Sequence, residues 1–262
     1  MACAPTCSPL LEIHGLVKRF GALVATDCLS LAVAHGEVHA LIGPNGAGKT
    51  SLIAQIAGTL APDAGRILFQ GRDITRLAAH RRVRRGLVRS FQITRLFDRF
   101  SAIENVALAV QARSGSSLSF WRPVARERAL RDEARAVLDL VGLADRADTP
   151  CAQLPHGEQR SLEVALALAT RPALLLLDEP LAGTGPQESE RMVALIQQLR
   201  EQVTILLVEH DVDAVFRLAD TVSVLVGGRV IASGSPEAVR HDPEVITAYL
   251  GNEAGAERGG GR

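Results

Sequence analysis

The stretch Gly43-Pro-Asn-Gly-Ala-Gly-Lys-Thr-Ser51 limits the possible folds of this chain more than any other, because it satisfies the phosphate-loop pattern of Gly, four residues, Gly, Lys and Ser or Thr. An apolar run from Val38 to Ile42 precedes it and predicts a buried strand, and Leu52 to Ala57 after it predicts a helix. A strand, a glycine-rich loop and a helix in this order form an anion site, because main-chain N–H groups and the positive end of the helix converge there. The alternative is a glycine-rich turn with a solvated lysine.

The residue types in this loop predict how a polyphosphate would be held. Its glycines permit backbone conformations that point successive N–H groups inward. Lys49 would reach the β- and γ-phosphates, Thr50 would offer its hydroxyl to Mg²⁺, and Ser51 can hydrogen-bond a neighbouring phosphate oxygen. The expected nucleotide-binding residues of the loop are Gly43, Pro44, Asn45, Gly46, Ala47, Gly48, Lys49, Thr50 and Ser51.

Two carboxylates and a histidine follow later apolar runs. Ala173 to Pro180 predicts a buried parallel strand that ends in Asp178 and Glu179, and Val203 to Val208 predicts another, followed by His210. Because open α/β sheets bind ligands at the carboxyl ends of their strands, we expect these side chains to face the phosphate loop. Asp178 would hold Mg²⁺, Glu179 would polarise a water for in-line attack on the γ-phosphate, and His210 would bind that phosphate or orient the water. The alternatives are capping carboxylates and a structural histidine.

The segment before the phosphate loop predicts an antiparallel sheet, since short β-like runs between Leu10 and Val38 are separated by Gly21 and His35-Gly36. Phe20 is notable there because aromatic residues make up only 3% of the chain. It is either an adenine-stacking platform or a core residue.

Seven arginines between Arg76 and Arg95 predict a solvated helix face that pairs with acidic neighbours. Contact with nucleic acid is the alternative. It is disfavoured because 29 basic and 29 acidic residues leave a formal charge of zero, so we expect no nucleic-acid partner.

Length and composition predict one α/β domain with an added lobe. No apolar run reaches the ~18 residues of a spanning helix, and the N-terminus lacks the features of a signal peptide. Four cysteines without metal-ligand spacing are typical of a reduced cytosolic chain. We expect a flexible N-terminus over 1–9, a single domain over 10–251 with a helical lobe at about 93–169, and a disordered tail over 252–262.

The order of these motifs resembles the ATP-binding cassette (ABC) ATPases from about Leu11 to Gly251: the phosphate loop, Gln92, the stretch 154–159, the strand with its acids, then His210. The resemblance implies an α/β fold, namely a P-loop NTPase core with an antiparallel β-subdomain and an inserted helical subdomain. It implies that Phe20 stacks on adenine and that Gln92 senses Mg²⁺ and touches the membrane partner. It also implies that residue 179 is the general base and residue 210 the switch histidine.

The resemblance further implies a head-to-tail pair, with ATP held between the phosphate loop of one subunit and the signature of the other. The signature positions are Pro155, His156, Gly157 and Glu158. Because Pro155-His156-Gly157 replaces the usual Ser-Gly-Gly, a hydroxyl and an N–H are lost, and we expect the composite site to close less tightly. Gly185 replaces the Asp common after the acids, which is a second departure.

Within the family, the stretches Arg89 to Phe97, Val208 to Asp211 and Ala248 to Gly251 resemble the branched-chain amino-acid importer ATPases. The ATPase of lipopolysaccharide export is the runner-up. Soluble ABC ATPases that act on nucleic acid, on ribosomes or in iron–sulfur assembly form a third possibility. The resemblance implies ATP and Mg²⁺ as cofactors and a peripheral position on the cytoplasmic face of the inner membrane. The implied partners are two transmembrane permease subunits, a second ABC ATPase subunit as a heterodimer or homodimer, and an extracytoplasmic solute-binding protein.

Overall fold

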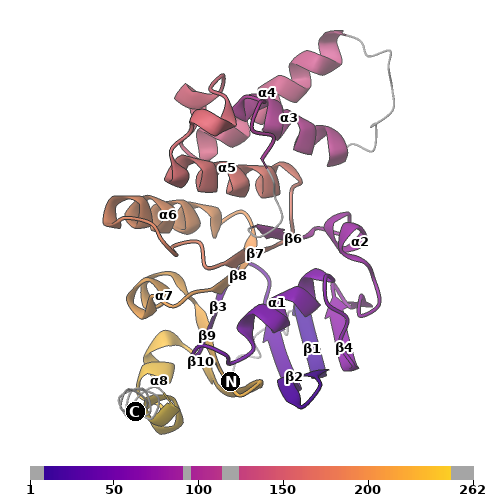
Figure 1. Ribbon diagram of the computed structural model, residues 1–262, viewed down its shortest axis with the longest axis vertical. Coiled ribbons are helices and arrows are strands. Elements are labelled where there is room, and N and C mark those ends of the chain that lie inside the picture. The colour runs from indigo at the N-terminus through magenta and orange to yellow at the C-terminus, as the bar shows by residue number, and fades with distance from the viewer. Residues whose placement is uncertain (1–8, 91–95, 114–123, 249–262) are drawn as a thin grey trace, which may run out of the picture.

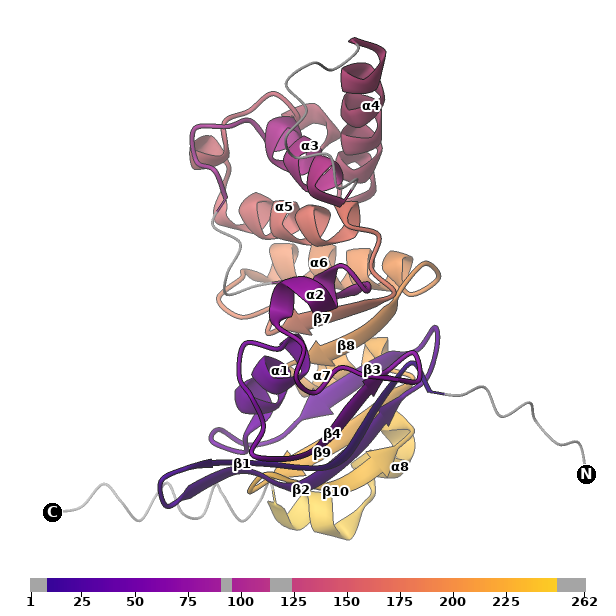
Figure 2. The same ribbon diagram turned by 90° about the vertical axis from the view of Figure 1, so that its right-hand side faces the viewer.

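The computed structural model describes residues 9–90, 96–113 and 124–248. Two β-sheets with their covering helices occupy one end of the long axis, and a group of helices occupies the other (Figures 1 and 2). Within the described ranges, no helix is both long and apolar enough to cross a membrane.

The expected antiparallel sheet precedes the phosphate loop. It has the strand order β2-β1-β4-β5. Its strands are β1 (Leu11–Phe20), β2 (Leu23–Val33), β4 (Ala64–Phe69) and β5 (Arg72–Asp73). The sheet follows from β1, where Leu11 and Ile13 alternate with more exposed residues and lie buried, so that one face of the strand covers the core.

The second sheet has six strands in the order β10-β9-β3-β8-β7-β6. Strand β3 pairs in parallel with β8 and β9, and β7 pairs in parallel with β6 and β8. The carboxyl ends of β3, β7 and β8 therefore meet at one edge, as predicted. The strands are β3 (Val38–Ile42), β6 (Leu87–Ser90), β7 (Leu174–Asp178), β8 (Thr204–Val208), β9 (Thr221–Val226) and β10 (Arg229–Gly234).

The four consecutive leucines of β7 explain why this strand lies at the centre of the molecule. Leu174 and Leu176 belong to a core cluster shared with the antiparallel sheet and α1 (Lys49–Ala57). Leu175 and Leu177 belong to a second cluster, shared with α5 (His156–Ala169) and α6 (Pro186–Leu199). Both faces of the strand are thus buried, as a continuous apolar run predicts.

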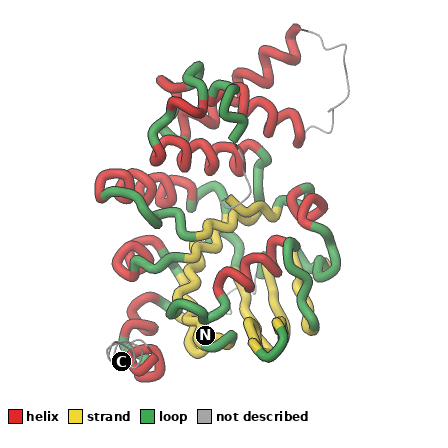
Figure 3. The backbone as a smooth tube through the Cα atoms, viewed as in Figure 1, coloured by secondary structure: helices red, strands yellow, loops and turns green. Residues whose placement is uncertain are grey.

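The remaining helices form two groups (Figure 3). Helices α2 (Ala79–Val83), α7 (Val212–Leu218) and α8 (Pro236–Arg240) accompany the sheets. The helical end contains α3 (Ala102–Arg113), α4 (Val124–Leu140) and the short turns η1 (Ala144–Arg146) and η2 (Cys151–Gln153). Helix α5 packs on α3 and α4 and also touches β6, so it connects this end to the sheet.

The arginine-rich segment corrects one expectation. Arg76, Arg81, Arg84 and Arg85 are exposed, as predicted, but Arg82 is only 2% exposed and Arg89 lies in β6. The guanidinium of Arg82 donates hydrogen bonds to main-chain carbonyls of Gln55, Ile56, Leu77 and Thr75, at 2.7–3.0 Å. The solvated helix face was therefore wrong at residues 82 and 89. The last carbonyls of α1 need a donor, and residue 82 supplies it.

Candidate functional site

The phosphate loop joins β3 to α1 through two glycines that no other residue can replace without movement. Gly48 has a φ of +106°, and a Cβ built on it would lie 2.1 Å from the carbonyl oxygen of Ala25. A Cβ on Gly43 would lie 2.1 Å from the carbonyl oxygen of Leu225. The loop is thus held against two neighbouring strands, which fixes the direction of its N–H groups.

The start of α1 presents unused hydrogen-bond donors. In the described part of the chain, the main-chain N–H groups of Gly48, Lys49 and Thr50 have no acceptor, and α1 has no side-chain cap. The first turn of a helix always leaves such donors, and its dipole favours negative charge beside them. The loop is therefore built to receive an anion.

Lys49 is buried at this loop. The residue is 6% exposed, and Nζ donates to the carbonyl oxygens of Gly43 at 2.6 Å and Pro44 at 3.1 Å. Burial lowers the pKa of Lys49, while the charges of Glu179 and Asp178 act in the opposite direction. An ammonium group that has lost its water is stabilised by any further negative charge, so a polyphosphate in the loop would strengthen its protonated form.

A cavity of about 260 Å³ extends from the loop toward the tip of the β1–β2 hairpin. The described residues that line it are Phe20, Leu23, Ala25, Asn45, Gly46, Ala47, Gly48, Lys49, Thr50, Ser51, Glu179 and His210. Phe20 is 48% exposed, so it is not a core residue. The cavity thus brings an exposed aromatic ring, the anion loop and two of the three predicted catalytic side chains together.

Glu179 and His210 meet at the carboxyl ends of β7 and β8. Nε2 of His210 lies 2.5 Å from Oε1 of Glu179, and the two side chains are 42% and 36% exposed. The φ of Glu179 is +52°, a strained value for a residue with a side chain. A carboxylate and an imidazole in hydrogen-bond contact beside an anion site can accept and pass a proton.

Asp178 lies deeper than Glu179 and is 8% exposed. Its Oδ2 atom is 2.5 Å from Nη2 of Arg89, on the neighbouring strand β6, and both side chains are nearly buried. Asp178 does not line the cavity, although its charge reaches Lys49. Sequence reasoning missed Arg89, because its only signal was membership of an arginine-rich segment.

The signature residues lie elsewhere in this chain. Pro155 is the N-terminal cap of α5, which begins at His156. Pro155, Gly157 and Glu158 line a separate cavity of about 630 Å³ together with residues of α6. One copy of the chain therefore does not bring the signature to its own phosphate loop. Gln92 lies outside the described residues.

Two further residues at the site were not predicted from the sequence. Leu23 is 66% exposed at the hairpin tip and lines the cavity beside Phe20. Glu209 is 2% exposed, and its carboxylate accepts hydrogen bonds from the main-chain N–H groups of Leu181 and His210. The only sequence signal for Leu23 was its position three residues after the notable Phe20, and Glu209 had no sequence signal.

Comparison with known proteins identifies the family of the chain. The ABC transporter family matches residues 26–182, and the family described as branched-chain amino acid ATP-binding cassette transporter matches residues 229–255. The chain is 40% identical to the high-affinity branched-chain amino acid transport ATP-binding protein BraF of Pseudomonas aeruginosa, covering 93% of this chain and 98% of that protein. It is 39% identical to LivG of Escherichia coli, which has the same description, with the same coverage.

Solved structures give the same result. The ADP conformation of an ATP-binding cassette of an ABC transporter superposes with a TM-score of 0.82 at 31% identity, over 93% of this chain and 99% of that chain. A nucleotide-free ATP-binding cassette from an ABC transporter superposes with a TM-score of 0.80 at 28% identity, over 92% and 99%.

Proposed function

Because the chain belongs to the ABC transporter family and is an ATPase subunit of that family, we propose that it hydrolyses ATP to drive a membrane importer of branched-chain or related amino acids. The observation that carries the proposal is the cavity that joins the anion loop to the Glu179–His210 pair. The match of residues 229–255 to the branched-chain family supports the solute class.

Nucleotide binding follows from the loop. The phosphates would accept hydrogen bonds from the N–H groups at the start of α1, and the ammonium of Lys49 would exchange its carbonyl acceptors for phosphate oxygens. The base would lie against Phe20, whose exposed ring borders the same cavity. These contacts would bring the terminal phosphate near Glu179, the residue that must act on water.

Mg²⁺ fits the oxygen donors of this site. Thr50 borders the cavity, and Asp178 ends β7 within electrostatic reach of Lys49. A hydroxyl and a carboxylate are the hard ligands that Mg²⁺ prefers, so we infer that these two residues hold it, with Gln92 as the third residue that the family pattern suggests. The metal would neutralise phosphate charge as it builds up.

Proton transfer is the task of the Glu179–His210 pair. We infer that Glu179 accepts a proton from the attacking water while the imidazole of His210, 2.5 Å from Oε1, keeps the carboxylate in place and hydrogen-bonds the transferred phosphate. Positioning of this kind supplies much of the rate in phosphoryl transfer.

A second ATPase subunit would complete the site. The signature residues Pro155 to Glu158 begin a helix at a different cavity from the one that contains the chain's own phosphate loop. A head-to-tail pair would bring the signature of one copy, or of a related ATPase, to the nucleotide of the other. We propose such a pair, with two permease subunits and an extracytoplasmic solute-binding protein, at the cytoplasmic face of the membrane.

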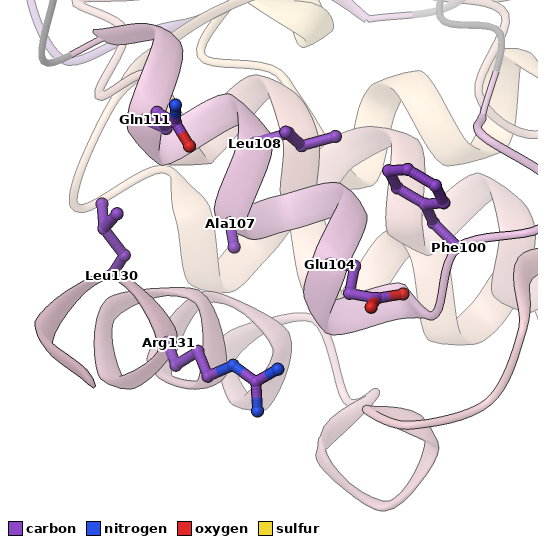
Figure 4. A pocket seen from close by; sticks show the side chains of 7 residues that line it. All are labelled: Phe100, Glu104, Ala107, Leu108, Gln111, Leu130 and Arg131. Atoms are coloured by element: carbon purple, nitrogen blue, oxygen red, sulfur yellow. The ribbon is translucent and has the colours of Figure 1, made fainter. Parts of the chain in front are cut away.

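The helical end offers a surface for a permease. A cavity of about 410 Å³ lies between α3 and α4. Figure 4 shows the side chains that line it, among them Phe100, Leu108, Leu130, Glu104 and Arg131. Phe100 and Leu108 are 42% and 37% exposed, and the ring of Phe100 stacks on the more exposed ring of Phe97 at 5.4 Å. Exposed apolar side chains gathered in this way are typical of protein contacts.

Uptake by the assembled transporter tests the proposal. The chain is co-expressed with two permease subunits and a second ATPase subunit, reconstituted in vesicles with a solute-binding protein, and assayed for ATP-dependent uptake of labelled leucine. The Glu179→Gln variant should still bind ATP and lose transport and hydrolysis by a factor on the order of 100 or more. Transport of lipopolysaccharide in place of amino acids, or undiminished hydrolysis by the variant, would contradict it.

A further inference from the structure

Glu209 is a buried carboxylate that the proposed chemistry does not use. It follows β8 directly, and its side chain is 2% exposed. Oε1 accepts a hydrogen bond from the N–H of Leu181 at 2.6 Å, and Oε2 accepts one from the N–H of His210 at 2.9 Å. Burial raises the pKa of Glu209, and these main-chain bonds, with one from Asp211, oppose that rise. Both oxygens are thus committed to main-chain donors.

The two segments that Glu209 joins are those that carry the proton-transfer pair. Leu181 follows two residues after Glu179, and His210 is the next residue in the chain. Other contacts hold each segment separately: Nη1 of Arg160 donates to the carbonyl of Pro180, and Asp211 caps α7 through the N–H of Ala214. The two segments also meet at the strand ends, where the N–H of Glu179 donates to the carbonyl of Val208 at 2.8 Å. Beyond that point the carboxylate of Glu209 bonds to both segments at once and so fixes the distance between Leu181 and His210.

The chemistry at this position requires a carboxylate. Both partners are N–H donors, and an ionised carboxylate is a pure acceptor. Glutamine has nearly the same shape, but its amide presents an NH₂ group to one of the two N–H donors. One main-chain bond would be lost, and the segment on that side would be free to shift.

We propose that Glu209 is a positioning residue for ATP hydrolysis: through its bonds to Leu181 and His210 it holds Glu179 and His210 in contact. This inference rests on the proposed function, because it assigns Glu209 to the same hydrolytic step. Glu209 does not border the nucleotide cavity, so it acts on turnover and not on nucleotide affinity. A misplacement of about 1 Å between reacting groups can lower a rate on the order of 100-fold.

The test compares Glu209→Gln and Glu209→Asp with Asp213→Asn, an exposed carboxylate of the same segment, in the assembled ATPase. Only variants that show a cooperative thermal unfolding transition, and are therefore folded, are compared in the ATPase assay. Glu209→Asp keeps the acceptor chemistry but shortens the reach, so it serves if the glutamine variant does not fold. For the folded Glu209 variants we expect kcat for ATP to fall about 10- to 100-fold, with KM and ATP affinity within about threefold of wild type. Asp213→Asn should match the wild type.

A double-mutant cycle separates positioning from a general structural role. In a His210→Ala background, the Glu209 substitutions should lower kcat by less than about threefold further, because they act through the missing imidazole. Equal effects in both backgrounds, unchanged kcat in the folded single variants, or a loss of ATP affinity that matches the loss of kcat would overturn the inference. If the wild-type assembly itself hydrolysed no ATP, the proposed function would fail instead.

Discussion

Arg82 allows the most detailed prediction, because its surroundings are fully defined. Burial lowers the pKa of Arg82 to about 10, so the guanidinium remains charged at neutral pH while it donates to four main-chain carbonyls. The bonds to Gln55 and Ile56, at 2.8 and 2.7 Å, are fully buried and close the end of α1. Arg82→Met removes all of these donors and keeps most of the apolar contact.

The magnitude follows from the carbonyls that are left behind. The carbonyl of Gln55 still accepts a hydrogen bond from the N–H of Gly58 at 3.2 Å, whereas the described residues supply no second donor to the carbonyl of Ile56. A buried acceptor without a partner costs about 1–3 kcal/mol, so the carbonyl of Ile56 alone costs about that much. The methionine recovers part of this because no charge has to be buried. We expect a net loss of about 1–3 kcal/mol in the free energy of unfolding, which for a chain of this size lowers Tm by about 2–12 °C.

The assay is thermal and urea unfolding, followed by circular dichroism, without nucleotide. Arg81→Met is the matched control, because Arg81 is the neighbouring residue of α2 and is exposed. The control should stay within about 0.5 kcal/mol of the wild type. If Arg82→Met were no less stable than this control, the four carbonyl bonds would not stabilise α1 as described.

Three further predictions concern the loop, the signature and pH. Gly48→Ala should weaken ATP binding at least about tenfold in a fluorescence titration, since its Cβ would meet the carbonyl oxygen of Ala25 at 2.1 Å. The control is Gly71→Ala, because Gly71 also has a positive φ, +69°, but no atom lies within 4 Å of its added Cβ. Equal ATP affinities of the two variants would contradict the steric argument. Pro155→Ser should raise the ATPase rate of the assembled transporter by restoring a hydroxyl to the signature, and an unchanged rate would refute the expected weak closure. Burial raises the pKa of Glu163, so the folded chain binds a proton at this carboxylate more readily than the unfolded chain does. The free energy of unfolding therefore falls as pH rises from the unfolded-state pKa of this group through its raised folded-state pKa. Glu163→Gln should therefore raise Tm at about pH 7 and lose this advantage near pH 4, whereas a gain that did not depend on pH would point to packing instead.

The central strands and the loop were predictable because their signals are local. A continuous apolar run followed by charged side chains identified β7 and β8 with Glu179 and His210, and the glycine pattern identified the anion loop after β3. Because parallel strands have their carboxyl ends at the same edge of a sheet, these strand ends were expected to lie together. The antiparallel sheet before the loop was also expected, but only the structure decided that the ring of Phe20 is exposed.

The contacts that the sequence did not predict depend on which segments become neighbours. Arg89 meets Asp178 across 89 residues of sequence because β6 lies beside β7, and nothing in a local pattern specifies that order. Arg82 likewise finds the end of α1 only after the chain has folded back on it. From the sequence, Glu209 was indistinguishable from any charged residue that follows a strand. The positioning role that we propose for it depends on the N–H groups of Leu181 and His210, which belong to two different segments.

Every step of the proposed hydrolysis requires that main-chain donors and Lys49 hold the phosphates of a nucleotide at the loop between β3 and α1. The deciding measurement is equilibrium binding of a fluorescent ATP analogue with Mg²⁺ to the wild type, to Lys49→Ala and to the exposed control Arg76→Ala. Lys49→Ala should bind at least about 10- to 100-fold more weakly, since a charged hydrogen bond is worth about 1.5–3 kcal/mol and 1.4 kcal/mol is tenfold in affinity, while Arg76→Ala should match the wild type. Equal affinity in all three proteins would mean that Lys49 does not hold the phosphates.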